Sequence, residues 1–195
     1  MIHNSSVIDK QAKVAQSVKI GPFCYVGPNV ELSDNVELIS NVHIEGNTKI
    51  GSGTRIFPFA SIGTQPQDLK FKNEKNSLLI GEKNTIREHV TINPGTEGGG
   101  STTEIGNDCL FMISSHVAHD CKIGNNVTLR YGTIIARGCD IDDNCYFSPR
   151  VMTNNLDSDK SQIGGAKFGK NTFVGTNAVI HHGIEIKENV IIGAM

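Results

Sequence analysis

The sequence predicts an all-β solenoid, a parallel β-helix, and three observations predict it. Aliphatic residues recur at every sixth position, glycine and asparagine recur between them, and tryptophan is absent from a chain with 21 glycines. A period of six fits neither an α-helix, which repeats at about 3.6 residues, nor a free strand, in which successive side chains alternate between the two faces. It fits a coil in which each hexad is one short strand followed by a corner.

The hexad frame is kept in four runs separated by polar segments. We expect each frame side chain to point into a triangular prism, with three hexads closing one coil, so that the chain forms about nine coils. The frame positions are Ile8, Val14, Ile20, Val26, Leu32, Leu38, Ile44, Ile50, Ile56 and Ile62; Ile80, Ile86 and Ile92; Ile105, Phe111, Val117, Ile123, Leu129, Ile135, Ile141 and Phe147; and Phe168, Val174, Ile180, Ile186 and Ile192.

The corners of such a prism require backbone with positive φ, which glycine and asparagine adopt more readily than other residues. We therefore expect corner positions at the residues that recur between frame positions: Gly21, Gly27, Gly51, Gly81, Gly106, Gly124, Asn84, Asn126, Asn144, Asn171 and Asn189.

Three polar segments interrupt the frame: residues 64–79, 94–103 and 152–167. Each reads as a loop that leaves the prism of one continuous domain, residues 1–195. Loops on a rigid scaffold commonly carry function. The alternative for each loop is a tolerated surface insertion.

Composition excludes several classes of protein. The net charge of −2 gives no basic excess for nucleic acid, and no apolar run is long enough to span a membrane. The N-terminal segment MIHNSSVIDK lacks the apolar core of a secretory signal. The five cysteines are odd in number and lack CxxC spacing, which favours a reducing cytoplasm over disulfides or a zinc site. We expect no metal and no tightly bound cofactor.

The segment SHVAHDC, residues 115–121, carries the clearest candidate chemistry. Because Val117 belongs to the inward frame, His116 and His119 are expected near the corners, projecting outside. Asp120 follows His119 and can orient its imidazole or favour the protonated form. A bland surface histidine is the alternative, and His-x-x-His alone is weak as a metal site.

Residues 1 to about 129 resemble the UDP-N-acetylglucosamine acyltransferases of lipid A synthesis, which are left-handed parallel β-helices of the hexapeptide-repeat type. The motifs QPQDLK, NPGTEGGG and HVAHDC occur in the order typical of that family. The matching stretches are GPFCYVGPNV (21–30), FPFASIGTQPQDLKF (57–71), NTIREHVTINPGTEGGGSTTEIGNDCLFM (84–112) and SHVAHDCKIGNNV (115–127).

The resemblance implies that His119 is the general base that deprotonates the sugar 3-hydroxyl, with Asp120 as its orienting partner. It implies that Asp68 and Lys70 bind the acceptor, with Gln67 beside them. His116 corresponds to a second active-site histidine. Lys70 can pair with a phosphate and Asp68 can accept sugar hydroxyls.

The sequence departs from the family after Leu129. Arg137 falls where the family has the glycine whose amide serves the oxyanion, and Asn154-Asn155 replace its His-Gln pair. The family's C-terminal helical region is also expected to be missing from the 195 residues. Residues 130–195 look instead like acetyl-CoA-dependent sugar acetyltransferases of the same fold.

Three functions therefore follow from the sequence. The leading one is acyl transfer from an acyl carrier protein thioester to the 3-hydroxyl of UDP-N-acetylglucosamine, as in lipid A synthesis. The alternative is an acetyl-CoA-dependent N-acetyltransferase acting on an amino sugar nucleotide. The third is a non-catalytic scaffold. We expect a cytoplasmic homotrimer, because this fold usually places active sites between neighbouring prisms.

Overall fold

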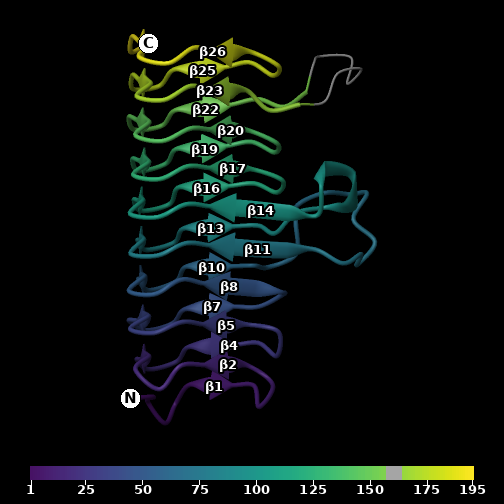
Figure 1. The fold of residues 1–195 in the computed structure, drawn as a ribbon, viewed down its shortest axis with the longest axis vertical. Helices are drawn as coiled ribbons and strands as arrows, with labels where there is room; N and C mark the ends of the chain where they lie inside the picture. Colours follow the sequence, from purple (N-terminus) through teal and green to yellow (C-terminus); the bar gives the residue numbers. More distant parts are fainter. Residues whose placement is uncertain (157–163) are drawn as a thin grey trace.

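The computed structural model describes residues 1–156 and 164–195 and shows a left-handed parallel β-helix of nine coils (Figure 1). Three parallel sheets of nine strands each form the faces of the prism, and successive strands of the chain fall on successive faces. Both the predicted fold and the predicted number of coils are confirmed. The only helix among the described residues is η1, a short 3-10 turn at Glu97–Gly99.

The strands of each sheet stack in chain order, three apart in numbering. Sheet 1 contains β1 (Val7–Ile8), β4 (Tyr25–Val26), β7 (His43–Ile44), β10 (Ser61–Ile62), β13 (Thr91–Ile92), β16 (His116–Val117), β19 (Ile134–Ile135), β22 (Met152–Thr153) and β25 (Val179–Ile180). Sheet 2 contains β2 (Lys13–Val14), β5 (Glu31–Leu32), β8 (Thr48–Ile50), β11 (Ser77–Ile80), β14 (Thr102–Ile105), β17 (Lys122–Ile123), β20 (Asp140–Ile141), β23 (Lys167–Phe168) and β26 (Glu185–Ile186). Sheet 3 contains β3 (Lys19–Ile20), β6 (Glu37–Leu38), β9 (Arg55–Ile56), β12 (Thr85–Ile86), β15 (Leu110–Phe111), β18 (Thr128–Leu129), β21 (Tyr146–Phe147), β24 (Phe173–Val174) and β27 (Ile191–Ile192).

The frame residues form the core, as the sequence predicts. Each is the last residue of its strand, and those of the central coils are buried, with Ile92, Phe111 and Val117 fully so. Burying one such side chain stabilises the fold by about 1.5–3 kcal/mol. Frame residues of the terminal coils, such as Ile8 and Ile192, are only partly buried because no further coil covers them.

The corner prediction is correct for most asparagines and wrong for the glycines. At most corners, positive φ occurs three residues after a frame residue, and four predicted asparagines adopt it there: Asn126, Asn144, Asn171 and Asn189. Asn84 does not. It lies at an inward position two residues before the frame residue Ile86, where its buried amide donates to the carbonyl oxygen of Gly106 at 2.9 Å.

The glycines that directly follow frame residues serve close approach between coils. None of the six predicted ones has positive φ. A Cβ on Gly21 would lie 1.7 Å from the carbonyl oxygen of Ile39, and one on Gly51 would lie 2.5 Å from the carbonyl carbon of Gly81. The spacing between coils therefore leaves no room for a side chain at these two positions.

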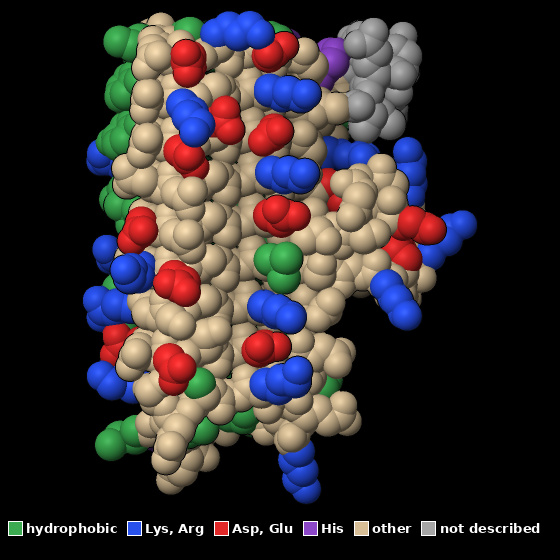
Figure 2. Space-filling model, viewed as in Figure 1, with side chains coloured by type: hydrophobic (Ala, Val, Ile, Leu, Met, Phe, Trp, Pro, Cys, Tyr) green, Lys and Arg blue, Asp and Glu red, His purple; other side chains and the backbone are tan. Residues whose placement is uncertain are grey.

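The outer face of sheet 2 is a ladder of alternating charges, interrupted once by Leu79. Paired neighbours run Lys13, Glu31, Lys49, then Glu104, Lys122, Asp140, Lys167 and Glu185. Figure 2 shows this column along the prism. Opposite charges on adjacent strands contribute roughly 0.2–1 kcal/mol each and keep this face hydrated.

All three interrupting segments leave the prism at one edge, where a strand of sheet 1 passes to the next strand of sheet 2. We call it the 1–2 edge, and Figure 1 shows the two central loops side by side there. The first two loops are shorter than predicted, because strands include their ends: they span residues 64–76 and 94–101. Strands β22 and β23 likewise include both ends of the third predicted segment, at residues 152–153 and 167. Residues 157–163 of the predicted third loop lie outside the described residues. No helix among the described residues is long and apolar enough to cross a membrane.

Candidate active site

His119 and Asp120 form the corner that follows β16 on the 1–2 edge. The sequence analysis expected both histidines of the segment to project outside the prism, but His119 is only 5% exposed. The hexad frame places it outside the core, and the two loops inserted at this edge then cover it, which the frame alone does not reveal. Its Nδ1 lies 2.7 Å from Oδ2 of Asp120.

Asp120 is held by a full set of hydrogen bonds. Its carboxylate accepts from the backbone N–H of Thr96 at 2.6 Å and from the Thr96 hydroxyl at 2.7 Å, besides its contact with His119. Burial alone would raise the pKa of Asp120, but the hydrogen bonds from His119 and Thr96 outweigh it and hold this pKa below its usual value. The carboxylate is therefore ionised and oriented towards the imidazole.

The backbone of Asp120 and the neighbouring η1 turn explain how this geometry is kept. Asp120 occupies the corner position with a φ of 63°, and its N–H donates to the Thr103 hydroxyl at 2.9 Å. Gly99 packs directly on the carboxylate, since a Cβ there would lie 1.9 Å from Cγ of Asp120. The NPGTEGGG motif thus supplies both Thr96, as a donor, and a glycine for close approach.

Asp68 approaches His119 from the other side, on the loop 64–76. Its Oδ2 lies 4.0 Å from Nε2 of His119. The Asp68 carboxylate also accepts the N–H of Lys70 at 2.9 Å, and its carbonyl oxygen accepts the N–H of Phe71 at 3.0 Å, which closes a tight turn. His119 therefore lies between two carboxylates, and its Nε2 is the nitrogen that points away from Asp120.

His116 lies on the outer face of β16, three residues before His119. Its Nδ1 lies 2.7 Å from the hydroxyl oxygen of Thr91 in β13. Burial, together with the charge of His119, lowers the pKa of His116 and favours its neutral form. It is partly buried, where the sequence analysis expected an exposed side chain.

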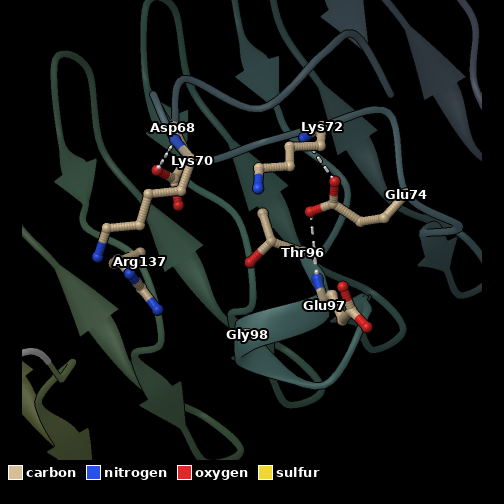
Figure 3. Close-up of a pocket in the computed structure, with 8 residues that line it drawn as sticks. All are labelled: Asp68, Lys70, Lys72, Glu74, Thr96, Glu97, Gly98 and Arg137. Carbon is tan, nitrogen blue, oxygen red and sulfur yellow. Dashed lines mark hydrogen bonds between the residues drawn. The ribbon is translucent and has the colours of Figure 1, made fainter.

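A cavity of about 480 Å³ opens beside this cluster (Figure 3). Of the predicted acceptor residues, Asp68 and Lys70 line it, whereas Gln67 is exposed on the loop and does not. The other lining residues are Lys72, Glu74, Thr96, Glu97, Gly98 and Arg137. The sequence analysis assigned no role in a site to any of these six. The lining is mostly charged, which suits a polar, ionic ligand.

Thr96 was missed although it lies within a motif that the sequence analysis quoted, because its role depends on how the loop folds back over the corner. Arg137 was noted only as the residue where the family has glycine. The structure places its side chain in the cavity (Figure 3). Among the residues that the structure describes, no three His, Cys, Asp or Glu side chains are arranged to hold a metal ion.

The two cysteines near the site, Cys109 and Cys121, are buried thiols. Burial raises the pKa of Cys109 to about 11 and raises that of Cys121 well above its ordinary value. The thiolate is the nucleophilic form of cysteine, so neither side chain is suited to react at neutral pH. All five cysteines are unpaired and buried.

The cluster has the arrangement of a general base. An imidazole whose Nδ1–H donates to a fixed carboxylate has its Nε2 lone pair available for a proton. Asp120 provides that carboxylate, while Asp68 and the cavity lie on the Nε2 side. The site can therefore deprotonate a hydroxyl that is bound next to a charged cavity.

Comparisons with known proteins identify the family of the chain. The model of the bacterial transferase hexapeptide repeat (six repeats) matches residues 102–137 and 165–195. The acyl-[acyl-carrier-protein]–UDP-N-acetylglucosamine O-acyltransferase of Paracoccus denitrificans is 59% identical over 88 residues, 45% of this chain and 34% of that protein. The corresponding protein of Aliarcobacter butzleri is 56% identical over 142 residues, 73% of this chain and 55% of that protein. The chain thus spans only part of the length of these relatives.

A solved structure extends the similarity beyond residue 129. The UDP-N-acetylglucosamine acyltransferase of Francisella novicida superposes with a TM-score of 0.92 and 36% identity, covering 100% of this chain and 67% of that one. Residues 130–156 and 164–195, where the sequence diverges from the family motifs, therefore continue the same solenoid. The chain belongs to the UDP-N-acetylglucosamine acyltransferase family of hexapeptide-repeat proteins.

Proposed function

We propose that the protein transfers an acyl group from an acyl carrier protein thioester to the 3-hydroxyl of UDP-N-acetylglucosamine. The observation that carries this proposal is His119, buried between Asp120 and Asp68, of which Asp68 lines a charged cavity. Relatives that are named for this activity share the fold and much of the sequence.

His119 is the base in the proposed reaction. With Nδ1–H donated to Asp120, Nε2 takes the proton of the sugar hydroxyl while the hydroxyl oxygen attacks the thioester carbonyl carbon. The tetrahedral intermediate then expels the thiolate, and the proton on Nε2 passes to the sulfur. The hydrogen bonds from Thr96 keep Asp120 ionised, so that it stabilises the imidazolium formed in between.

Asp68 and Lys70 anchor the acceptor. Asp68 lies near Nε2 of His119, so its carboxylate can accept a hydroxyl of the same sugar ring whose 3-hydroxyl meets the base. Lys70 is two residues further along the turn and lines the cavity, where its ammonium can pair with a phosphate. Gln67, exposed beside them, is proposed to contact the bound nucleotide sugar from the loop.

We further propose a cytoplasmic homotrimer. The edge between sheets 3 and 1 exposes large apolar side chains on four coils, at Phe23, Phe59, Ile113 and Tyr131. Sheet 2 is covered by charges, so the apolar edge is the better contact for a second copy. Sedimentation equilibrium should give three times the chain mass, and a stable, fully active monomer would disprove the trimer. The unpaired, buried cysteines fit a reducing cytoplasm.

The proposed function is tested by presenting purified protein with UDP-N-acetylglucosamine and a panel of donors. Mass spectrometry should detect the O-acylated product with an acyl carrier protein thioester, and acetyl-CoA should be a poor donor. Efficient N-acetylation of an amino sugar nucleotide by acetyl-CoA would support the alternative function instead. No product with any donor, from a folded protein, would contradict both.

A further inference from the structure

Arg137 lies directly beside the proposed base, one coil further along the prism. It follows β19 at the 1–2 edge, as His119 follows β16, and the N–H of Gly138 donates to the carbonyl oxygen of His119 at 3.1 Å. Adjacent strands in a sheet are about 4.8 Å apart. The two corners are therefore stacked, and the Arg137 side chain extends from the second corner into the cavity (Figure 3).

Basic side chains enter this cavity from two separate parts of the chain. Lys70 comes from the loop 64–76, and Arg137 comes from the corner after β19. In Figure 3 the Lys70 side chain runs from the Asp68 turn towards Arg137, so that the two charged groups lie at the same end of the cavity. Within the described residues, no carboxylate lies at ion-pair distance from either group.

Two of the three carboxylates that line the cavity, Glu74 and Asp68, already have other hydrogen-bond donors. Glu74 accepts the backbone N–H of Lys72 at 2.7 Å and that of Glu97 at 3.4 Å, and these bonds lower its pKa. Asp68 accepts the N–H of Lys70 and faces His119. Two cations at one end of a cavity repel each other, and a bound anion between them removes that cost.

We propose that Arg137 binds the diphosphate of the nucleotide-sugar acceptor, together with Lys70. A guanidinium can donate two parallel hydrogen bonds to a phosphate, a geometry that lysine lacks. The proposal rests on the proposed function, because it takes the acceptor to be a UDP-sugar. It adds a specificity contact at a position where the sequence of this chain departs from its family.

Phosphate also occurs in the acyl donor, on the pantetheine arm, and the position of Arg137 favours the acceptor. The diphosphate is attached to the same sugar ring as the hydroxyl that His119 deprotonates, so it must lie within one ring of the base. The donor phosphate is separated from the thioester by the whole pantetheine arm. Arg137, stacked one coil from His119, therefore lies at a distance from the base that suits the acceptor diphosphate.

The test measures binding of UDP and UDP-N-acetylglucosamine by calorimetry, at low and high salt. Arg137→Ala should weaken both by about 10- to 100-fold, since a hydrogen bond to a charged group contributes about 1.5–3 kcal/mol. Arg137→Lys should restore part of the loss and none of the bidentate geometry. Arg55→Ala, which removes an arginine of sheet 3 that pairs with Glu37 at 2.7 Å, is the matched control and should bind like the wild type.

Two results would overturn the inference. In the first, Arg137→Ala binds UDP normally but needs more donor for half-maximal rate, which assigns the arginine to the donor phosphate. In the second, nucleotide binding and both KM values are unchanged and only kcat falls. Melting curves of each variant confirm that it is folded. A wild-type protein that binds UDP through Arg137 but transfers no acyl group would disprove the proposed function and leave this inference standing.

Discussion

Gly99 and Asp120, 21 positions apart in the chain, are in direct contact: a Cβ on Gly99 would lie 1.9 Å from Cγ of Asp120. The η1 turn thereby closes over the carboxylate that orients His119, and Thr96, just before the turn, donates two hydrogen bonds to it. The loop 94–101 thus holds the proposed catalytic pair, His119 and Asp120, in place through both its shape and its hydrogen bonds.

Gly99→Ala should distort this arrangement. The added methyl group meets a carboxylate that hydrogen bonds hold in place, so we expect a stability loss of about 1–3 kcal/mol together with a lower kcat. Gly98→Ala, at the neighbouring position, is the control, because nothing lies within 4 Å of its Cβ position. Melting temperature and kcat of both variants check this. Equal effects from the two substitutions would show that the turn, and not its contact with Asp120, is sensitive.

His119→Ala should lower kcat by about 10²–10⁴-fold, the usual contribution of a positioned base. Acceptor binding should change little, because the loss falls mainly in the transition state. His116→Ala should cost less, since that ring contacts Thr91 and not Asp120.

His43→Ala is the matched control for His119, since this histidine lies on β7, three strands away from β16 in sheet 1, and stacks on Tyr25. Steady-state kinetics and the oligomeric state should be measured on the same samples. A His119→Ala protein with near wild-type kcat would remove this residue from the mechanism. If both active-site histidines served only an intersubunit seam, activity would fall only as assembly is lost.

Asp120→Asn should lower kcat while preserving the fold, because the amide keeps the shape but not the charge that stabilises an imidazolium. It should also change acid stability. The folded-state pKa of Asp120 is lowered, so its contribution to stability is present above the unfolded pKa of about 3.9 and is lost as pH falls through the lower folded value. Urea unfolding from pH 7 to 2 checks this. The variant should lack that part of the acid destabilisation, and identical pH profiles would contradict the prediction.

Lys70→Ala should raise the acceptor KM and leave the fold intact, because Lys70 lies next to Asp68 at the end of the cavity near His119. Lys72→Ala should do much less. Lys72 also lines the cavity, but it lies on the side of Glu74, whose carboxylate accepts the backbone N–H of Lys72. Kinetics with varied UDP-N-acetylglucosamine separate the two. Equal small effects would show that the net charge of the loop matters and a specific contact does not.

The sequence alone was sufficient for the solenoid. Because aliphatic and aromatic residues recur at every sixth position, Phe111, Val117 and Ile123 could be placed in the core from the sequence. The alternation of Lys13, Glu31 and Lys49 follows from the same frame, since residues 18 apart stack in one sheet. The left hand and the roles of His119, Asp68 and Lys70 came from the resemblance to a family.

Tertiary structure decided what covers the corner at His119. The frame predicts where coils stack but carries no information on how an inserted loop folds back, so Thr96 and Gly99 could not be placed on Asp120 from periodicity. The structure also corrected the role predicted for the glycines that follow frame residues. At Gly21 the short distance between neighbouring coils, and not a positive φ, excludes a side chain. In the sequence, Arg137 stood out only because it occupies a position where the family has glycine. The structure shows that coils stacked at one edge place its side chain and that of Lys70 in the same cavity.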